Sequence, residues 1–475
     1  MRTMLFIGGE WRPASDGSTF PILNPATEKP ITEVSSATLE DVASAVDVAH
    51  IAGQEWASRL PRERAEVLRN AFNLLTDCKQ DIAKLMTLEN GKALVDSLGE
   101  VTYATEFFRW YSEEAVRNIG ELTQSPSGNN RIVVISQPVG VSVLVTPWNF
   151  PAAMATRKIA PALAAGCAVI LKPASDTPLT ALRVAELLTE AGVPPGVLNV
   201  VPSRRSGEVV SAMLHNPLVR KLSFTGSTEV GRALLSEASD CVVNCSMELG
   251  GNAPFLVLKD ADVGAAVAGA MIAKMRNGGE ACTAANRFYA HAKVYEEFIS
   301  KFAAAMEALK VGPGLEPGVQ LGPMVNAQAV KDIDRLVQDA TGKGAKVLTG
   351  GRPTAGVGYY YPPTVLSHVP ANANILKEEV FGPVAPVVSF NDEQEAIELA
   401  NDTEYGLVSY LYTKDLARGM AIAEQLEAGM IGLNRGLVSD PAAPFGGIKQ
   451  SGLGREGSYE GMMEYMEKKY VAVEW

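Results

Sequence analysis

Three residues in this sequence have side chains that could carry chemistry. Cys282 lies among small residues in NGGEACTAANR, so a substrate could approach its sulfur closely. A cysteine nucleophile needs an activating partner, and no histidine sits in a matching context, which argues against a Cys–His hydrolase. Glu248, in MELGGN, could act as a base, and Asn149, in TPWNFP, could donate its amide to an oxyanion. The plainer interpretations are a small buried side chain, a surface carboxylate and a helix N-cap.

Gly226 and Ser227 lie in SFTGSTEVGRA, between a predicted strand and a predicted helix. The spacing from Gly226 to Gly231 resembles a phosphate loop, but Arg232 and Ala233 stand where that motif requires Lys and Ser or Thr. The segment also lacks a G-x-G-x-x-G fingerprint. Ser227 at a helix N-terminus could still bind a pyrophosphate, although an ordinary tight turn explains the same residues.

The composition is that of an ordinary globular protein. The chain has 475 residues, of which 47% are hydrophobic and 20% are charged, enough for two or three domains with large cores. The net charge of −12 comes without a basic block, which disfavours nucleic acids and anionic membranes as partners. An anionic substrate would therefore need a local group of arginines.

The cysteines and histidines predict neither disulfides nor a metal site. Five cysteines at irregular spacing fit a reducing compartment, and no signal peptide or membrane-spanning run is recognised, so we expect a cytoplasmic protein. Cys241 and Cys245 have no second pair or histidine nearby, and the four histidines are scattered. We therefore expect no metal.

The hydrophobic pattern predicts an α/β fold. Residues from about 38 to 118 show helical periodicity, and a polar stretch near Gly120 precedes two β-like runs. From VSVLVT to STEVGRALLSEAS, strands alternate with helices, which is typical of βαβ units and a parallel sheet. A second α/β stretch follows from NAPFLVLKDAD to about Asn434, and the C-terminal tail ends in a β-like segment.

Seven segments occur in the order expected of the aldehyde dehydrogenase superfamily, which this chain resembles from about residue 140 to 457. The resemblance implies a doubly wound parallel-sheet coenzyme domain (1–118 and 138–248), an α/β catalytic domain (249–434), and a small β oligomerisation element with the tail (119–137 and 435–475). It also implies a homodimer or homotetramer. The segments are TPWNFP, LKPAS, FTGSTEVG, MELGGN, GGEAC, EEVFGPV and PFGGIKQSGLGREGS.

The resemblance assigns roles to the candidate residues. Cys282 would be the nucleophile, Glu248 the general base, and Asn149 would form the oxyanion hole with the Cys282 N–H. An aldehyde would become a thioester on Cys282, which water activated by Glu248 hydrolyses to the acid. The residues implied to contact the cofactor are Trp148, Lys172, Ser175, Gly226, Ser227, Glu379 and Phe381.

Ser175 bears on the choice between NADP and NAD. Relatives that prefer NAD often have a glutamate at this position, where it binds the adenosine ribose hydroxyls. A carboxylate there would repel a 2′-phosphate, whereas Ser175 can donate to it and Lys172 can pair with it. We expect NADP to be accepted, and the sequence leaves open whether it is preferred over NAD. The plainer interpretation is that Ser175 merely leaves room and that both cofactors are used.

Within the superfamily, the chain is most similar to succinate-semialdehyde dehydrogenases. That subfamily binds the distal carboxylate with two arginines and a serine, and we match Arg157, Arg287 and Ser439 to them. Arg435 replaces a threonine of the subfamily and would add charge near the substrate mouth. Ala284 stands where many bacterial relatives have a second cysteine, so a disulfide switch of that kind is not expected.

Three alternatives remain open from the sequence. The substrate could be a longer or aromatic aldehyde, such as glutarate semialdehyde or a benzaldehyde. The chain could be a catalytically silent relative, which the intact Cys282, Glu248 and Asn149 argue against. Coenzyme A could resolve the thioester in place of water, an alternative that Glu248 disfavours and that an assay with coenzyme A would settle.

Overall fold

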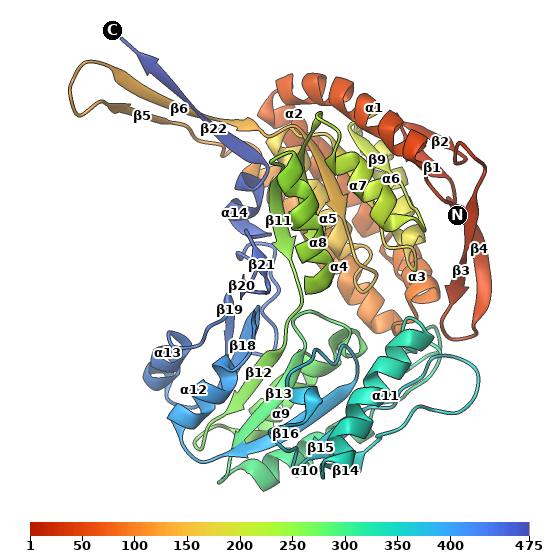
Figure 1. The fold of residues 1–475 in the computed structure, drawn as a ribbon, viewed down its shortest axis with the longest axis vertical. Helices are drawn as coiled ribbons and strands as arrows, with labels where there is room; N and C mark the ends of the chain where they lie inside the picture. The colour runs from red at the N-terminus through yellow and green to blue at the C-terminus, as the bar shows by residue number, and fades with distance from the viewer. Residues whose placement is uncertain (475) are drawn as a thin grey trace.

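The computed structural model describes residues 1–474, and its main sheets have eight, seven and three strands. Figure 1 shows the eight-stranded sheet with its helices in the upper part of the molecule and the seven-stranded sheet in the lower part. The three-stranded sheet projects from the top. This mixed α/β fold with parallel sheets confirms the predicted fold class.

The eight-stranded sheet has five parallel strands at its centre. The strand order is β2-β1-β9-β8-β7-β10-β11-β21, and β1, β2 and β21 are antiparallel to their neighbours. The central strands are almost wholly buried apolar runs, as a parallel sheet covered on both faces requires. The strands are β1 (Leu5–Ile7), β2 (Glu10–Arg12), β7 (Val141–Val145), β8 (Val169–Lys172), β9 (Leu198–Val200), β10 (Val219–Thr225), β11 (Asn244–Glu248) and β21 (Gly452–Leu453).

Helices cover both faces of this sheet, so it is doubly wound. Helices α2 to α6 share one apolar core, whereas α1, α7 and α8 share the core on the opposite face. The helices are α1 (Leu39–Ser58), α2 (Pro61–Asp77), α3 (Lys79–Asn90), α4 (Leu94–Glu114), α5 (Ala153–Ala165), α6 (Pro178–Glu190), α7 (Ser206–Leu214) and α8 (Thr228–Asp240).

The seven-stranded sheet has the order β14-β15-β16-β13-β12-β18-β19, and all its pairs are parallel except β14 with β15. Two further apolar cores lie against it. Its elements are β12 (Ala253–Val257), α9 (Val263–Met275), η1 (Arg276–Gly279), β13 (Ala285–His291), α10 (Tyr295–Glu307), α11 (Ala327–Gly342), β14 (Lys346–Thr349), β15 (Thr364–Ser367), η2 (Asn374–Leu376), β16 (Val384–Phe390), α12 (Glu393–Asn401), β18 (Val408–Tyr412), α13 (Leu416–Ala423) and β19 (Met430–Leu433).

The three-stranded sheet joins the last strand of the chain to residues 121–138. Strand β6 (Arg131–Pro138) pairs with β5 (Glu121–Gln124) on one side and β22 (Met466–Val473) on the other. The predicted boundary of the tail, 435–475, is too broad, because β21 pairs with β11 and α14 (Ser458–Met463) packs against α4 and α5. The remaining strands form two short pairs: β3 (Thr19–Asn24) with β4 (Lys29–Ser35), and β17 (Tyr405–Gly406) with β20 (Ile448–Lys449).

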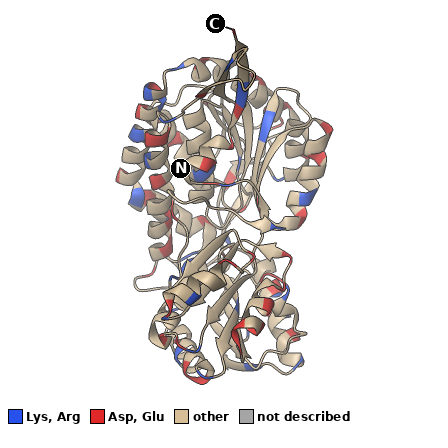
Figure 2. Ribbon diagram, turned by 90° about the vertical axis from the view of Figure 1, so that its left-hand side faces the viewer, with Lys and Arg blue, Asp and Glu red and all other residues tan. Residues whose placement is uncertain are grey.

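Charge is mixed over the outer helices. Figure 2 shows acidic and basic side chains interspersed on them, in keeping with a net charge of −12 that is spread along the chain. Within residues 1–474, no helix is both long enough and apolar enough to cross a membrane.

Candidate active site

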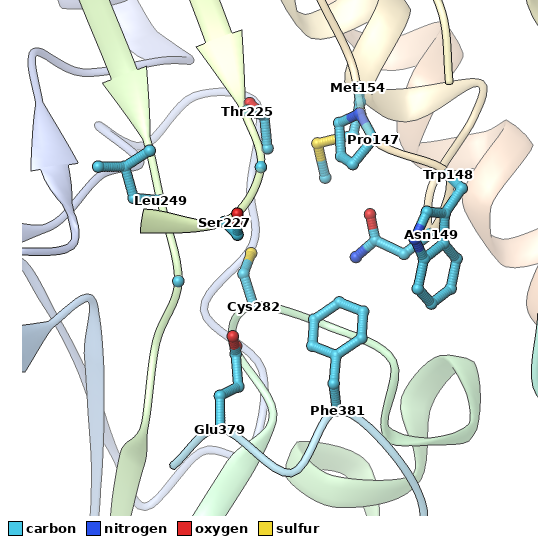
Figure 3. A pocket seen from close by; sticks show the side chains of 12 residues that line it. Pro147, Trp148, Asn149, Met154, Thr225, Ser227, Leu249, Cys282, Glu379 and Phe381 are labelled. Carbon is cyan, nitrogen blue, oxygen red and sulfur yellow. The ribbon is translucent and has the colours of Figure 1, made fainter. Parts of the chain in front are cut away.

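A cavity of about 220 Å³ lies at the carboxyl edge of the eight-stranded sheet. The segments after β7, β10 and β11 line one part, and residues preceding β13 and β16 line the rest. Neighbouring parallel strands end at the same edge, which brings these three segments together. Figure 3 shows the Cys282 thiol, the Asn149 amide and the Phe381 ring around this space. The lining residues are Pro147, Trp148, Asn149, Met154, Thr225, Gly226, Ser227, Leu249, Gly250, Cys282, Glu379 and Phe381.

The cavity brings together seven of the candidate residues from distant parts of the sequence. They are Trp148, Asn149, Gly226, Ser227, Cys282, Glu379 and Phe381. The candidates outside the lining are Arg157, Lys172, Ser175, Glu248, Arg287, Arg435 and Ser439.

Cys282 lies between η1 and β13, and its side chain is half-buried. Burial raises the pKa of its thiol to about 12, and the negative charge of Glu248 adds to that rise. Arg157 and Arg276 act in the opposite direction. The thiol is therefore protonated at neutral pH in this state, so nucleophilic attack requires a base to accept its proton.

Glu248 is the last residue of β11, next to the lining residues Leu249 and Gly250. Its side chain is buried, and its Oε1 has no hydrogen-bond partner among residues 1–474. Burial raises the pKa of this carboxyl to about 8, against the opposing charge of Arg157. A buried carboxyl with a free oxygen and a pKa near neutrality can exchange a proton with a thiol or a water molecule.

Asn149 follows β7 in a loop that several side chains hold in place. Its Nδ2 donates to the Glu280 carbonyl at 3.0 Å, close to Cys282 in the sequence. Its own carbonyl accepts from Lys92 Nζ at 2.6 Å and from Asn277 Nδ2 at 2.9 Å. These bonds fix the backbone that carries the amide, as an oxyanion donor requires.

The groups suited to a dinucleotide lie along the same edge. Ser227 caps α8 by accepting from the Val230 N–H at 3.4 Å. A Cβ at Gly226 would lie 2.4 Å from the Phe224 ring, so a side chain there would have to displace that ring. Gly226 and Ser227 thus bring the N-terminus of α8 to the cavity, and helix N-termini favour the binding of phosphate groups.

Lys172 is the last residue of β8, and Ser175 follows it in the next loop. Lys172 Nζ donates to Ser206 Oγ at 2.5 Å, and burial lowers the pKa of this lysine to about 8. Ser175 is half-buried. A buried ammonium group that is hydrogen-bonded to a hydroxyl can still bind ribose oxygens or a phosphate.

Glu379 and Phe381 enter the cavity from the segment before β16. Glu379 Oε1 accepts from the Gly251 N–H at 3.2 Å, and burial raises the pKa of this carboxyl to about 8. The Phe381 ring meets the Trp148 indole edge-on, with ring centres 5.4 Å apart. The two aromatic rings thus form an apolar side of the cavity opposite the carboxyl group.

The structure corrects the expectation for Arg287. Its guanidinium donates to the carbonyls of Asn252, Leu399 and Ala400, each at 2.8 Å. It is almost wholly buried, with 1% of its surface exposed. These carbonyls use the donors that a substrate carboxylate would need, so Arg287 holds the backbone together instead.

Arg276, in η1, is the arginine that sequence reasoning missed. Its Nη1 donates to Ser439 Oγ at 3.1 Å, and its guanidinium lies over the rings of Phe150 at 4.9 Å and Tyr103 at 5.6 Å. No carboxylate within residues 1–474 forms an ion pair with it. The available signal was its position, six residues before Cys282 in the segment between α9 and β13, whereas Arg287 lies on β13 itself.

Arg157 and Arg435 differ from Arg276 in their surroundings. Arg157 is buried, pairs with Glu456, and lies 4.3 Å over the Phe445 ring. Its Nη2 also contacts the sulfur of Met154, which lines the cavity. Arg435 is exposed, and its Nε donates to the Leu437 carbonyl at 2.7 Å. Arg157 therefore shares the buried Glu456 carboxylate with Lys158, in an ion-pair network inside the protein.

A comparison with protein families explains this arrangement. The model of the aldehyde dehydrogenase family matches residues 11–471. The chain belongs to the aldehyde dehydrogenase family. The match spans nearly all of the described elements, from the N-terminal strands to β22.

Individual aldehyde dehydrogenases are similar to the chain over nearly their whole length. A succinate-semialdehyde dehydrogenase of Paenarthrobacter nicotinovorans is 55% identical over 93% of this chain and 98% of its own. A glutarate-semialdehyde dehydrogenase of Pseudomonas aeruginosa is 49% identical over 99% of this chain and 98% of its own.

Solved structures show the same fold. An NADP-dependent enzyme of Escherichia coli has a TM-score of 0.98 at 47% identity, covering 100% of this chain and 98% of its own. An NAD+ complex of an aldehyde dehydrogenase from Bacillus cereus has a TM-score of 0.97 at 35% identity, covering 100% of this chain and 97% of its own. The chain is thus an enzyme of the aldehyde oxidoreductase class.

Proposed function

We propose that this aldehyde dehydrogenase oxidises a semialdehyde with a terminal carboxylate, with succinate semialdehyde as the substrate and succinate as the product. The observation that carries the proposal is the unpaired Arg276 guanidinium, which donates to Ser439 and lies close enough to Cys282 to lower the pKa of its thiol. Relatives that act on succinate and glutarate semialdehydes support the class. Glutarate semialdehyde is the alternative substrate, with one more methylene.

The two arginines near the thiol have different parts in this proposal. Arg157 and Lys158 both pair with the buried Glu456, so Arg157 is held inside an ion-pair network. Arg276 has no such partner, and a planar guanidinium binds a carboxylate through two parallel hydrogen bonds. Arg276 is therefore the anchor for the distal carboxylate, and Ser439 adds a third donor.

Cys282 and Asn149 line the cavity, and Glu248 ends β11 beside it, which supports the following roles. Glu248 accepts the proton of the Cys282 thiol, and the thiolate attacks the aldehyde carbon. The Asn149 amide and the Cys282 N–H donate to the oxyanion that forms. When bound, the nicotinamide cofactor supplies the acceptor for the hydride that leaves this carbon. The Cys282 thioester is then hydrolysed by a water molecule whose proton passes to Glu248.

The cofactor is held by residues at the carboxyl edge of the eight-stranded sheet. Ser227 and the N-terminus of α8 bind the pyrophosphate, and Lys172 binds the adenosine ribose. Ser175 leaves room for a 2′-phosphate and can donate to it, so the proposal is that NADP is used and NAD is accepted less readily. Glu379 would hold the nicotinamide ribose and Phe381 would lie near the nicotinamide, while Trp148 would line the adenosine and pyrophosphate path.

The Arg276→Met variant tests the proposal. We expect kcat/KM for succinate semialdehyde to fall about a hundred-fold, because charge-assisted hydrogen bonds to the carboxylate are lost, while kcat/KM for butanal stays within a few-fold. Initial rates with both aldehydes and with glutarate semialdehyde measure this. Arg352→Met, which removes an exposed charge in the segment between β14 and β15, is the matched control and should leave all rates unchanged. A wild-type enzyme that prefers butanal would contradict the proposal.

A further inference from the structure

Tyr103, on α4, has a polar group that the steps above do not use. Its hydroxyl is buried and has no hydrogen-bond partner of good geometry within residues 1–474. The groups that lower its pKa are the guanidinium groups of Arg276 and of Arg157, which also approaches the hydroxyl oxygen, and a guanidinium can only donate. The O–H of Tyr103 therefore lacks an acceptor, and an unsatisfied buried donor carries a free-energy cost unless a ligand supplies the acceptor.

The ring of Tyr103 lies against the proposed carboxylate anchor. The Arg276 guanidinium lies 5.6 Å from the centre of this ring. The same guanidinium also lies over the Phe150 ring and donates to Ser439. Burial raises the pKa of Tyr103, and the charges of Arg157 and Arg276 oppose that rise. The hydroxyl therefore lies within the field of both arginines and stays protonated at neutral pH.

The orientation of Tyr103 is fixed by its own helix. Its ring packs edge-on against Phe107, with ring centres 4.9 Å apart. Phe107 is fully buried in the core of the eight-stranded sheet, so it restricts the ring. A donor held in this way loses little conformational entropy when it binds a ligand.

We propose that Tyr103 is a specificity-determining residue that donates its hydroxyl to the terminal carboxylate of the substrate, beside Arg276 and Ser439. The inference rests on the proposed function, because it needs a substrate with a distal anion. A carboxylate offers about four acceptor positions. Arg276 fills two of them, Ser439 fills one and Tyr103 fills the last.

This arrangement also disfavours uncharged aldehydes. When butanal occupies the cavity, its methyl end gives the Tyr103 hydroxyl no acceptor, so the buried donor stays unsatisfied. Sites built to hydrogen-bond a substrate group discriminate strongly against analogues that lack that group, because their own polar atoms are left unpaired. Tyr103 therefore strengthens the binding of the semialdehyde and weakens the binding of its uncharged analogue.

Tyr103→Phe removes only the hydroxyl. We expect kcat/KM for succinate semialdehyde to fall about ten-fold to a hundred-fold, as expected for one hydrogen bond to a charged group, with butanal unchanged or improved. The inhibition constant of succinate, competing with the semialdehyde, should rise by a similar factor. The melting temperature should stay constant or rise, because the variant loses an unsatisfied buried donor.

Tyr111→Phe is the matched control. Tyr111 lies on the same helix and also has a buried hydroxyl without a partner, but it faces Gly461 of α14. We expect this variant to retain wild-type selectivity. If wild type prefers succinate semialdehyde and Tyr103→Phe keeps the full preference and the full affinity for succinate, the role of Tyr103 is wrong while the proposed function stands. If wild type prefers butanal, the proposed function itself fails.

Discussion

The charge of Glu248 affects how readily the Cys282 thiol loses its proton. Burial raises both pKa values, to about 12 for the thiol and about 8 for the carboxyl, and the charge of Glu248 contributes to the rise at Cys282. A deprotonated Glu248 can accept a proton from water, but its negative charge makes the Cys282 thiolate harder to form. Arg157 and Arg276 offset part of this cost by lowering the pKa of Cys282.

The pH dependence of the second half-reaction follows from Glu248. Its raised pKa means that the carboxyl is protonated below about pH 8, so the base form grows as the pH rises. We expect the rate of thioester hydrolysis to increase with pH up to about 8 and to level off above it. Single-turnover experiments that follow acid release at different pH values measure this.

Glu248→Gln should remove that pH dependence and slow both half-reactions, because the Cys282 thiol and the hydrolytic water lose the same base. A single equivalent of reduced cofactor per Cys282 should form slowly, and intact mass spectrometry should find the thioester adduct, because the adduct is no longer hydrolysed. Cys282→Ala, which lacks the sulfur, should give neither the reduced cofactor nor the adduct. Steady-state turnover of Glu248→Gln close to wild type would show that another group activates the water.

At the scale of elements, one buried ion pair connects α4 to the loop that carries Asn149. Lys92 Nζ lies 2.6 Å from Glu100 and 2.6 Å from the Asn149 carbonyl. Glu100 also accepts from the N–H groups of Ala152 and Ala153, at the start of α5. Glu100 therefore accepts hydrogen bonds from free N–H groups at the N-terminus of α5, while Lys92 positions the backbone of Asn149.

Lys92→Met should leave Glu100 as an uncompensated buried charge and lower the free energy of unfolding by about 3–5 kcal/mol. The double variant Lys92→Met/Glu100→Gln should recover much of this stability, because no lone charge remains. Both variants lose the bond to the Asn149 carbonyl, so kcat should stay low in both. Urea unfolding and kcat measure this, and strictly additive losses of stability would contradict the coupling.

At the scale of the whole molecule, the three-stranded sheet projects from the body and exposes apolar side chains (Figure 1). Leu122 of β5 and Val471 of β22 both lie opposite Val133 of β6, so the three share one face. Leu122 is 65% exposed and Val471 is 40% exposed. We propose that a second copy of the chain covers this sheet, because apolar faces and free strand edges favour association.

Leu122→Asp/Val471→Asp should convert the oligomer into monomers, because two buried charges would be unpaired in the interface. Sedimentation velocity at micromolar concentration measures the change. Val357→Asp replaces a 70% exposed valine in the segment between β14 and β15 and should leave the oligomer intact. A monomeric wild type would contradict the proposal.

The sequence by itself determined the architecture and much of the cavity. Alternation of apolar strands with helices predicted the parallel sheets, because buried strands and amphipathic helices have local patterns. The resemblance of short motifs to those of aldehyde dehydrogenases pointed to Asn149, Cys282 and Phe381, which the fold brings to one cavity, and each motif occupies a segment directly after or before a strand. Such features depend on neighbours along the chain, so they can be recognised without coordinates.

Only the tertiary structure decided which charges are open to a ligand. Arg157 shares the carboxylate of Glu456, which is far away in the sequence, with Lys158, and Arg287 is occupied by backbone carbonyls of distant residues such as Leu399. Arg276 stays unpaired beside Tyr103. The sequence pointed to Arg157 and Arg287 and not to Arg276, so it did not separate the three arginines correctly. Their difference arises because ion pairing and hydrogen-bond satisfaction depend on the groups that folding brings within a few ångströms.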